Sequence, residues 1–268
     1  PRAVRIAIDR QYIRDSSIKF RQIGLEKNLS RLFTGLDINV RHLSVEEQRE
    51  LIAIHSKKER FLDEPMDEDN LEDRFYSHRY ISALEILLDE TSSTTRKIIL
   101  EGGPGQGKST ITQVLTQIYR QQLLGKNDMD PEGRWIPPQK SRHPLRIELR
   151  KFAEWLSKKS GESIEEYLAF VIKQDAGGSS VTVDDIHNIV EGSYVILILD
   201  GLDEVGSDDL RNEVLVKIAE SIYRLENNLN VGLRVIITTR PPSVTNCTEY
   251  LTDFKRFPIA PMTPSRIK

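Results

Sequence analysis

The residues GGPGQGKST (Gly102–Thr110) follow the pattern G-x-x-x-x-G-K-[ST] and stand between an apolar run, KIIL (Lys97–Leu100), and an amphipathic run. In this pattern a strand leads into a glycine-rich turn, and N–H groups of the turn and of the next helix surround phosphate groups. A surface glycine turn is the alternative interpretation. The amphipathic run argues against it, because its apolar residues recur at the spacing of a helix that packs one face on a sheet: Ile111, Val114, Leu115 and Ile118.

We predict that the whole turn contacts a bound nucleotide. Glycines at 105 and 107 allow the backbone to close around an anion. Lys108 is placed to reach the β- and γ-phosphates, and the Ser109 hydroxyl to ligate Mg²⁺. The predicted phosphate-binding residues are Gly102, Gly103, Pro104, Gly105, Gln106, Gly107, Lys108, Ser109 and Thr110.

Strand-like and helix-like patterns alternate after Lys97, which indicates an α/β fold with helices on both faces of a mostly parallel sheet. We expect the three-layer α/β/α architecture of a P-loop NTPase, with a helical N-terminal extension. Further strands are predicted at Leu145–Arg150, Tyr194–Asp200, Arg234–Thr239 and Phe254–Ala260. Capping boxes predict helices that begin after Ser44 and Ser163, and apolar residues predict helices over Tyr80–Leu88 and from Leu210 to Ile222.

Charged residues follow two of these strands. Because ligands of open α/β sheets gather beyond the carboxyl ends of the strands, Asp200 is predicted to hold Mg²⁺ through water. Asp203 and Glu204 would orient or deprotonate the attacking water, and Arg240 would contact the γ-phosphate. With Lys108, these are the predicted catalytic residues; an acidic turn and a surface arginine are the alternatives. Arg146 and Arg150 are interpreted as structural.

The chain has 268 residues, 38% of them hydrophobic, and a net charge of −3. This charge indicates neither a nucleic-acid partner nor an anionic membrane. The single cysteine, Cys247, excludes an internal disulfide framework, and no apolar run is long enough for a membrane span, so we expect a cytoplasmic protein. The histidines lack metal-binding spacing.

Three regions are predicted along the chain. Residues 1–77 form a helical extension or connector with an acidic linker at 59–74, residues 78–260 form the NTPase domain, and residues 261–268 begin a helical lid. A divalent-ion site in the acidic linker is the less favoured alternative, because it lacks the offsets of a calcium loop. We expect the chain to be part of a longer protein.

The segments GGPGQGKST, ILILDGLDEV and VIITTRP resemble the Walker A, extended Walker B and sensor 1 segments of the NACHT branch of STAND nucleoside triphosphatases. That group contains animal NLR immune receptors and bacterial anti-phage sensors, and the turn is most similar to those of bacterial members. The D-G-h-D-E form of the second segment is the specific part, and the resemblance covers about residues 80–264.

The resemblance implies a slow ATPase that acts as a switch, with ADP or ATP and Mg²⁺ as cofactors. At rest the protein would be closed and would bind ADP. When domains outside this sequence bind a trigger ligand, the protein would bind ATP and self-associate. A non-hydrolysing scaffold stabilised by nucleotide is the alternative, and a GTPase or kinase is a weaker one. The phosphate motifs do not show the base, for which Tyr80–Ile81 and Phe33–Thr34 are candidate contacts.

Overall fold

The computed structural model describes residues 2–15, 17–20, 25–28, 36–39, 43–59, 80–90, 92, 94–126, 138–158, 163–178, 180–241 and 248–260. The predicted acidic linker beyond Glu59, the predicted lid at 261–268, and Phe33, Thr34 and Cys247 lie outside these residues. Among the described helices, none combines the length and the apolar character that a membrane span requires.

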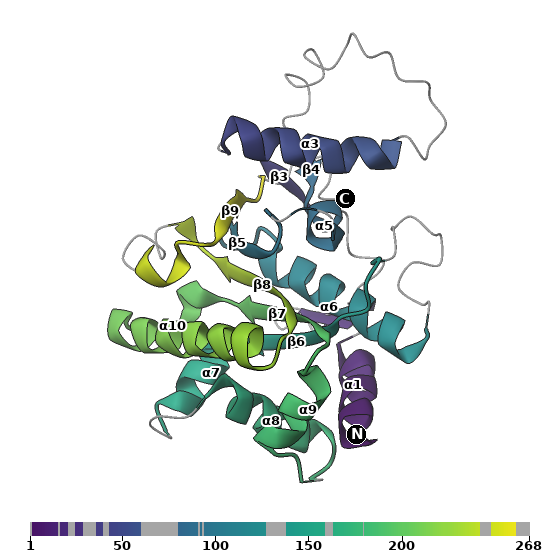
Figure 1. Ribbon diagram of the computed structural model, residues 1–268, viewed down its shortest axis with the longest axis vertical. Coiled ribbons are helices and arrows are strands. Elements are labelled where there is room, and N and C mark those ends of the chain that lie inside the picture. Colours follow the sequence, from purple (N-terminus) through teal and green to yellow (C-terminus); the bar gives the residue numbers. More distant parts are fainter. Residues whose placement is uncertain are drawn as a thin grey trace.

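The core is a five-stranded sheet whose neighbouring strands are all parallel, in the order β6-β7-β8-β5-β9. This confirms the predicted α/β fold (Figure 1). The strands are β5 (Lys97–Glu101), β6 (His143–Glu148), β7 (Tyr194–Asp200), β8 (Gly232–Thr239) and β9 (Lys255–Pro258).

Alternation along the central strand divides the core into two layers. On β7 the odd residues Val195, Leu197 and Leu199 pack against α7 (Leu149–Leu156), α8 (Ile164–Asp175) and α10 (Asp208–Tyr223). The even residues Ile196 and Ile198 pack on the other face, against α5 (Ala83–Leu88) and α6 (Lys108–Leu124). A continuously apolar strand buried on both faces is typical of a parallel sheet with helices on both sides.

The predicted periodicity of α6 is confirmed, because Ile111, Val114, Leu115 and Ile118 are all buried on one face. Two predicted capping boxes are also present. The Ser163 hydroxyl accepts from the N–H of Glu166 and the Glu166 carboxylate accepts from the N–H of Ser163, which starts α8. Ser44 and Glu47 make the same exchange at the start of α3 (Val45–Glu59).

The structure corrects the kind of element assigned to parts of two predicted segments. The predicted strand 145–150 ends at Glu148, and its last two residues start α7, where Leu149 turns into the core. The predicted helix 80–88 begins as a strand, β4 (Tyr80–Ser82), because this segment pairs antiparallel with β3 (Asp37–Asn39) before α5 starts. Pattern alone does not show such pairing.

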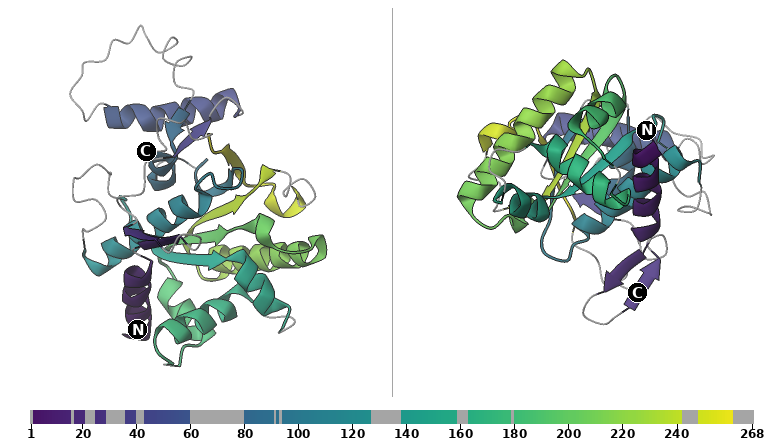
Figure 2. Two further views of the ribbon diagram at one scale, coloured as in Figure 1. Left: turned by 180° about the vertical axis from the view of Figure 1, so that it is seen from behind. Right: turned by 90° about the horizontal axis from the view of Figure 1, so that it is seen from below.

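The N-terminal part contains strands as well as helices. An antiparallel pair, β1 (Ser17–Phe20) and β2 (Leu25–Asn28), follows α1 (Arg2–Arg14), and Ile38 of β3 bridges to Ile259 after β9. Helix α1 lies beside α6 and α8 at one end of the molecule, and α3 lies at the other end (Figures 1 and 2). The predicted boundary at 77/78 stays a prediction.

The remaining elements are short. They are α9 (Val183–Val190), the 3-10 helices Leu202–Glu204 and Thr248–Leu251, and a π-helical turn, Arg224–Asn228, that extends α10.

A buried ionic network joins the sheet to its flanks near the amino ends of the strands. The Glu90 carboxylate accepts from Arg142 Nε at 2.8 Å and Nη2 at 2.5 Å, and lies 3.7 Å from Arg234 Nη1. Burial alone would raise the pKa of Glu90, but the hydrogen bonds from Arg142 and the charges of Arg234 and Arg142 outweigh it and hold the pKa below its ordinary value. No sequence pattern predicted this network.

Candidate functional site

The glycine-rich turn joins β5 to α6, as predicted. Gly107 is the residue before the helix and has φ of 82°, a left-handed conformation that favours glycine. The turn is anchored to the sheet, because the N–H of Gly102 donates to the carbonyl of Thr239 on β8 at 3.1 Å. The Gln106 side chain accepts from the N–H of Gly103 at 2.5 Å. The N-terminus of a 17-residue helix therefore opens at the carboxyl edge of the sheet.

Lys108 is folded back onto its own turn. Its ammonium group donates to the carbonyls of Gly102 at 2.6 Å and Gly103 at 3.0 Å. Burial lowers the pKa of Lys108 below its ordinary value; the Asp203 carboxylate opposes this shift and the Arg240 guanidinium adds to it. The charges of Asp200 and Glu204 also favour the ionised form of Lys108, so the predicted catalytic residues act electrostatically on the same ammonium group. A phosphate at Lys108 would favour its charged form.

Asp200 meets the turn because of strand order and side-chain parity. β8 lies between β7 and β5 and pairs with both, and Asp200 continues the even-numbered face of β7, on which α6 packs. The Ser109 hydroxyl donates to Asp200 Oδ1 at 3.2 Å. The two residues predicted to hold Mg²⁺, which are 91 positions apart in the sequence, are thus in contact.

A second hydroxyl, which the sequence analysis missed, fixes the Asp200 carboxylate. The buried Thr238 Oγ1 donates to Asp200 Oδ1 at 2.6 Å and accepts from the N–H of Gly201 at 2.8 Å. It therefore holds both the end of β7 and the carboxylate. The sequence signal that could have identified Thr238 is its position as the penultimate residue of β8, the parallel strand next to β7.

Arg146, which was interpreted as structural, contacts the predicted metal ligand Asp200. Its Nη2 lies 2.5 Å from Asp200 Oδ2, and the two side chains are 16% and 5% exposed. The register of β6 and β7 explains this contact, because Arg146 pairs with Ile198 and so shares the face of Asp200. Arg150, in contrast, is exposed and pairs with Glu154 on α7.

Arg240 and Asp203 face each other at the rim of the site, with Arg240 Nε 2.7 Å from Asp203 Oδ2. The exposed Glu204 follows in the same short helix, and its side chain lies over Gly201. Gly201 has φ of 83°, and a Cβ there would meet the Glu204 carboxyl carbon at 3.3 Å. Glycine at this position therefore lets the chain turn sharply and lets Glu204 fold over it.

The oxygen donors fit a magnesium site of the kind that keeps several waters. Mg²⁺ prefers oxygen ligands, and where it binds with a nucleotide it takes one or two protein ligands besides phosphates and water. Ser109 and Asp200 supply a hydroxyl and a carboxylate in contact. Among the described residues there is no cluster of three or more His, Cys, Asp or Glu side chains that would hold a metal by themselves.

Of the candidate base contacts, the structure describes the side chain of Ile81. Ile81 is buried in the core beneath α5, with 1% of its surface exposed. Phe33 and Thr34 lie outside the described residues, as does the side chain of Tyr80.

Comparisons with known proteins identify the family. No curated protein matches this sequence significantly. A family model, described as the NACHT domain, matches residues 96–268 and so includes the glycine-rich turn, Asp200 and Arg240. Since the match covers more than half of the chain, and since the parallel sheet has the form expected of a P-loop NTPase, this protein belongs to the NACHT family of P-loop NTPases, a nucleotide-binding module.

Proposed function

We propose that this module binds ATP with Mg²⁺ and hydrolyses it slowly, and that the bound nucleotide controls conformation and self-association in a signalling protein. The observation that carries the proposal is the contact between Ser109 and Asp200, at the start of the helix that begins with Lys108. It joins the helix that would bind phosphates to the carboxylate that would bind the metal.

Each residue has a distinct role in the proposal. Lys108 binds the β- and γ-phosphates, and Ser109 and Asp200 hold Mg²⁺. Asp203 and Glu204 orient the attacking water and accept its proton, while Arg240 contacts the γ-phosphate. Bound Mg²⁺ would neutralise negative charge that develops on the phosphate oxygens.

Arg240 could couple the bound nucleotide to the conformation of the protein. It is paired with Asp203 at 2.7 Å, and its side chain is half exposed, so it can exchange this carboxylate for a γ-phosphate. ATP and ADP differ in that phosphate alone. A nucleotide shifts a conformational equilibrium only by its difference in affinity for the two states, and one charge-assisted contact contributes about 1.5–3 kcal/mol. Arg240 therefore supplies part of a switch, and contacts between copies of the chain would supply the rest.

The test compares two variants with matched controls. Lys108→Ala should abolish binding of fluorescent ADP and ATP analogues, whereas Lys255→Ala, which removes an exposed lysine paired with Glu47, should not. Glu204→Gln should preserve binding and slow hydrolysis at least tenfold, whereas Glu154→Gln on α7 should leave both unchanged. Unchanged binding in Lys108→Ala would refute the proposed site.

Hydrolysis distinguishes the proposal from its alternatives. Binding without turnover in the wild-type protein, with no effect of Glu204→Gln, would favour a scaffold stabilised by nucleotide. Competition between ATP and GTP for the same site measures base preference, and tighter binding of GTP would favour a GTPase. Light scattering with ADP and then ATP measures self-association, which the proposal expects with ATP only.

A further inference from the structure

We propose that Arg146 is a positioning residue that opposes Mg²⁺ at Asp200, so that this arginine sets the magnesium concentration at which nucleotide binds tightly. This inference rests on the proposed function, because it assigns a role toward the metal that Asp200 would hold. Arg146 lies outside the glycine-rich turn and outside the two segments, after β7 and β8, that contain the predicted catalytic residues besides Lys108.

The two oxygens of the Asp200 carboxylate have different partners. Oδ1 accepts from the Ser109 and Thr238 hydroxyl groups, while Oδ2 faces the Arg146 guanidinium at 2.5 Å. Both members of this ion pair are largely buried, so water screens their attraction poorly. The arginine thus holds the orientation of the carboxylate and neutralises the charge that would attract a metal ion.

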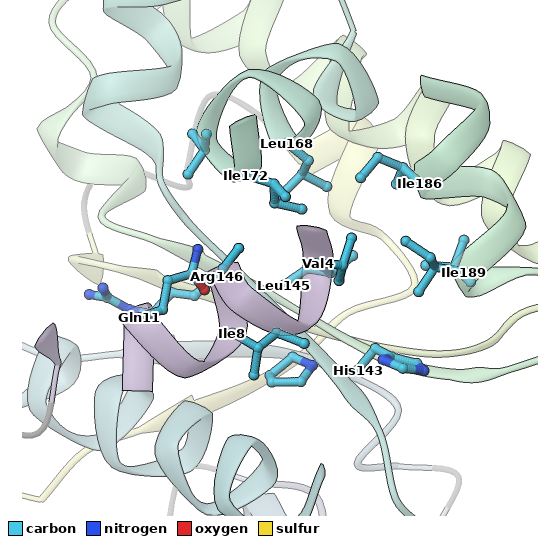
Figure 3. Close-up of a pocket in the computed structure, with 14 residues that line it drawn as sticks. Val4, Ile8, Gln11, His143, Leu145, Arg146, Leu168, Ile172, Ile186 and Ile189 are labelled. Carbon is cyan, nitrogen blue, oxygen red and sulfur yellow. The ribbon is translucent and has the colours of Figure 1, made fainter. Parts of the chain in front are cut away.

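The surroundings of Arg146 make Asp200 its main acceptor. Its Nε is buried and has no acceptor among the described residues. Figure 3 shows Arg146 of β6 beside Gln11 of α1, at one end of a pocket whose lining is mostly apolar, including Ile8 and Leu168. The lining offers the guanidinium few other acceptors, and its side chain is 16% exposed.

The charged groups near Arg146 favour the same arrangement. Arg120 of α6 lies close enough for the charges of the two arginines to interact unfavourably, and Asp15 at the end of α1 pairs with Arg120 at 2.6 Å. Glu148 is the second carboxylate near Arg146, at 3.9 Å on the same strand, and it is half exposed. Among the described residues Asp200 is therefore the closest negative charge to Arg146, and Glu148 is the acceptor available if a metal ion displaces the guanidinium.

Mg²⁺ and the guanidinium group are both cations that require the same carboxylate. A metal ion near Ser109 and Asp200 would be repelled by the buried charge of Arg146, or would have to displace it toward Glu148. Removing that charge while keeping Asp200 should strengthen binding of Mg²⁺ by about tenfold or more, because Coulomb interactions between buried charges are weakly screened.

The experiment measures how the binding of nucleotide, and not its turnover, depends on the concentration of Mg²⁺. Mg²⁺ is titrated into the wild-type chain with a fluorescent ADP analogue, and the concentration for half-maximal binding is recorded. Arg146→Gln and Arg146→Met remove the charge, and Arg146→Lys keeps it. Arg96→Gln is the matched control, since Arg96 is exposed and pairs with Glu226 at the opposite end of the sheet.

Both neutral variants should lower the half-maximal Mg²⁺ concentration about tenfold, while Arg146→Lys and Arg96→Gln should stay within about threefold of the wild type. An unchanged or raised value in a folded neutral variant would overturn the inference. So would unfolding of both neutral variants beside a folded, wild-type-like Arg146→Lys, because that result indicates a structural role. If the wild-type chain binds no nucleotide at any Mg²⁺ concentration, the proposed function fails instead.

Discussion

Replacing Thr238 by valine tests how the candidate site is held together. Thr238 is fully buried, and its hydroxyl both donates to Asp200 at 2.6 Å and accepts from the N–H of Gly201 at 2.8 Å. Valine has nearly the same shape, so the substitution opens no cavity. The loss of stability therefore reports on the two hydrogen bonds.

The expected magnitude follows from these two bonds. A hydrogen bond to a charged group contributes about 1.5–3 kcal/mol, and a buried N–H left without an acceptor costs about 1–3 kcal/mol. Asp200 keeps its contacts with Ser109 and Arg146, so we expect the lower half of the combined range, roughly 3–4 kcal/mol. For a domain of this size that corresponds to a fall in Tm of about 6–15 °C.

Urea denaturation followed by circular dichroism measures the effect, with Thr116→Val as the matched control. Thr116 is also fully buried, but its hydroxyl donates at 2.6 Å to the carbonyl of Thr112 within α6. That carbonyl lies in the helix and accepts a backbone hydrogen bond there, so its variant should lose no more than about 1 kcal/mol. Equal losses in the two variants, or a loss below about 1 kcal/mol for Thr238→Val, would refute the reasoning.

Two further substitutions test buried ion pairs. Glu90→Gln should cost roughly 3–5 kcal/mol in urea denaturation, because Arg142 and Arg234 lose their carboxylate. Folding lowers the pKa of Glu90, so its carboxylate contributes fully to the free energy of unfolding above pH 4.5, the pKa of this group in the unfolded chain. The contribution is lost as the pH falls through the lower pKa of the folded state. Glu90→Gln should remove this dependence of stability on acid pH. Arg120→Met leaves Asp15 without its buried partner, so α1 amides should exchange hydrogen faster, while amides of β7 stay protected.

Local patterns in the sequence were sufficient to predict the layers of the fold. The glycine-rich turn, the buried strand that ends at Asp200 and the periodicity of α6 each depend on neighbouring residues. The insertion of β8 between β5 and β7 depends on long-range pairing, which periodicity does not encode. The same limit explains β4, whose three residues pair with a strand about 40 positions earlier and so override their helical pattern.

Candidate site residues at the ends of strands could be predicted from the sequence. Those that lie before the end of a strand were harder to predict. Asp200 and Arg240 were selected as candidates because the carboxyl ends of parallel strands share one edge of the sheet. Arg146 and Thr238 lie before the ends of their strands, and their role depends on register and on the face to which they point. Residues two positions apart on a strand point to the same face of the sheet. Arg146 is the charged residue two positions before Glu148, the register partner of Asp200, so this rule would have selected Arg146.

The charges of the site are paired within the protein, which affects how nucleotide affinity should be understood. Lys108 contacts two backbone carbonyls, Arg240 contacts Asp203, and Arg146 contacts Asp200. A nucleotide that recruits one of these cations must replace the existing partner, so the gain is the difference between two interactions, and each 1.4 kcal/mol of that difference changes affinity about tenfold. Substitutions that remove a competing partner, as at Asp203 or Arg146, should therefore change affinity in addition to those that remove a ligand contact, as at Lys108, and the two kinds of variant report different parts of the same balance.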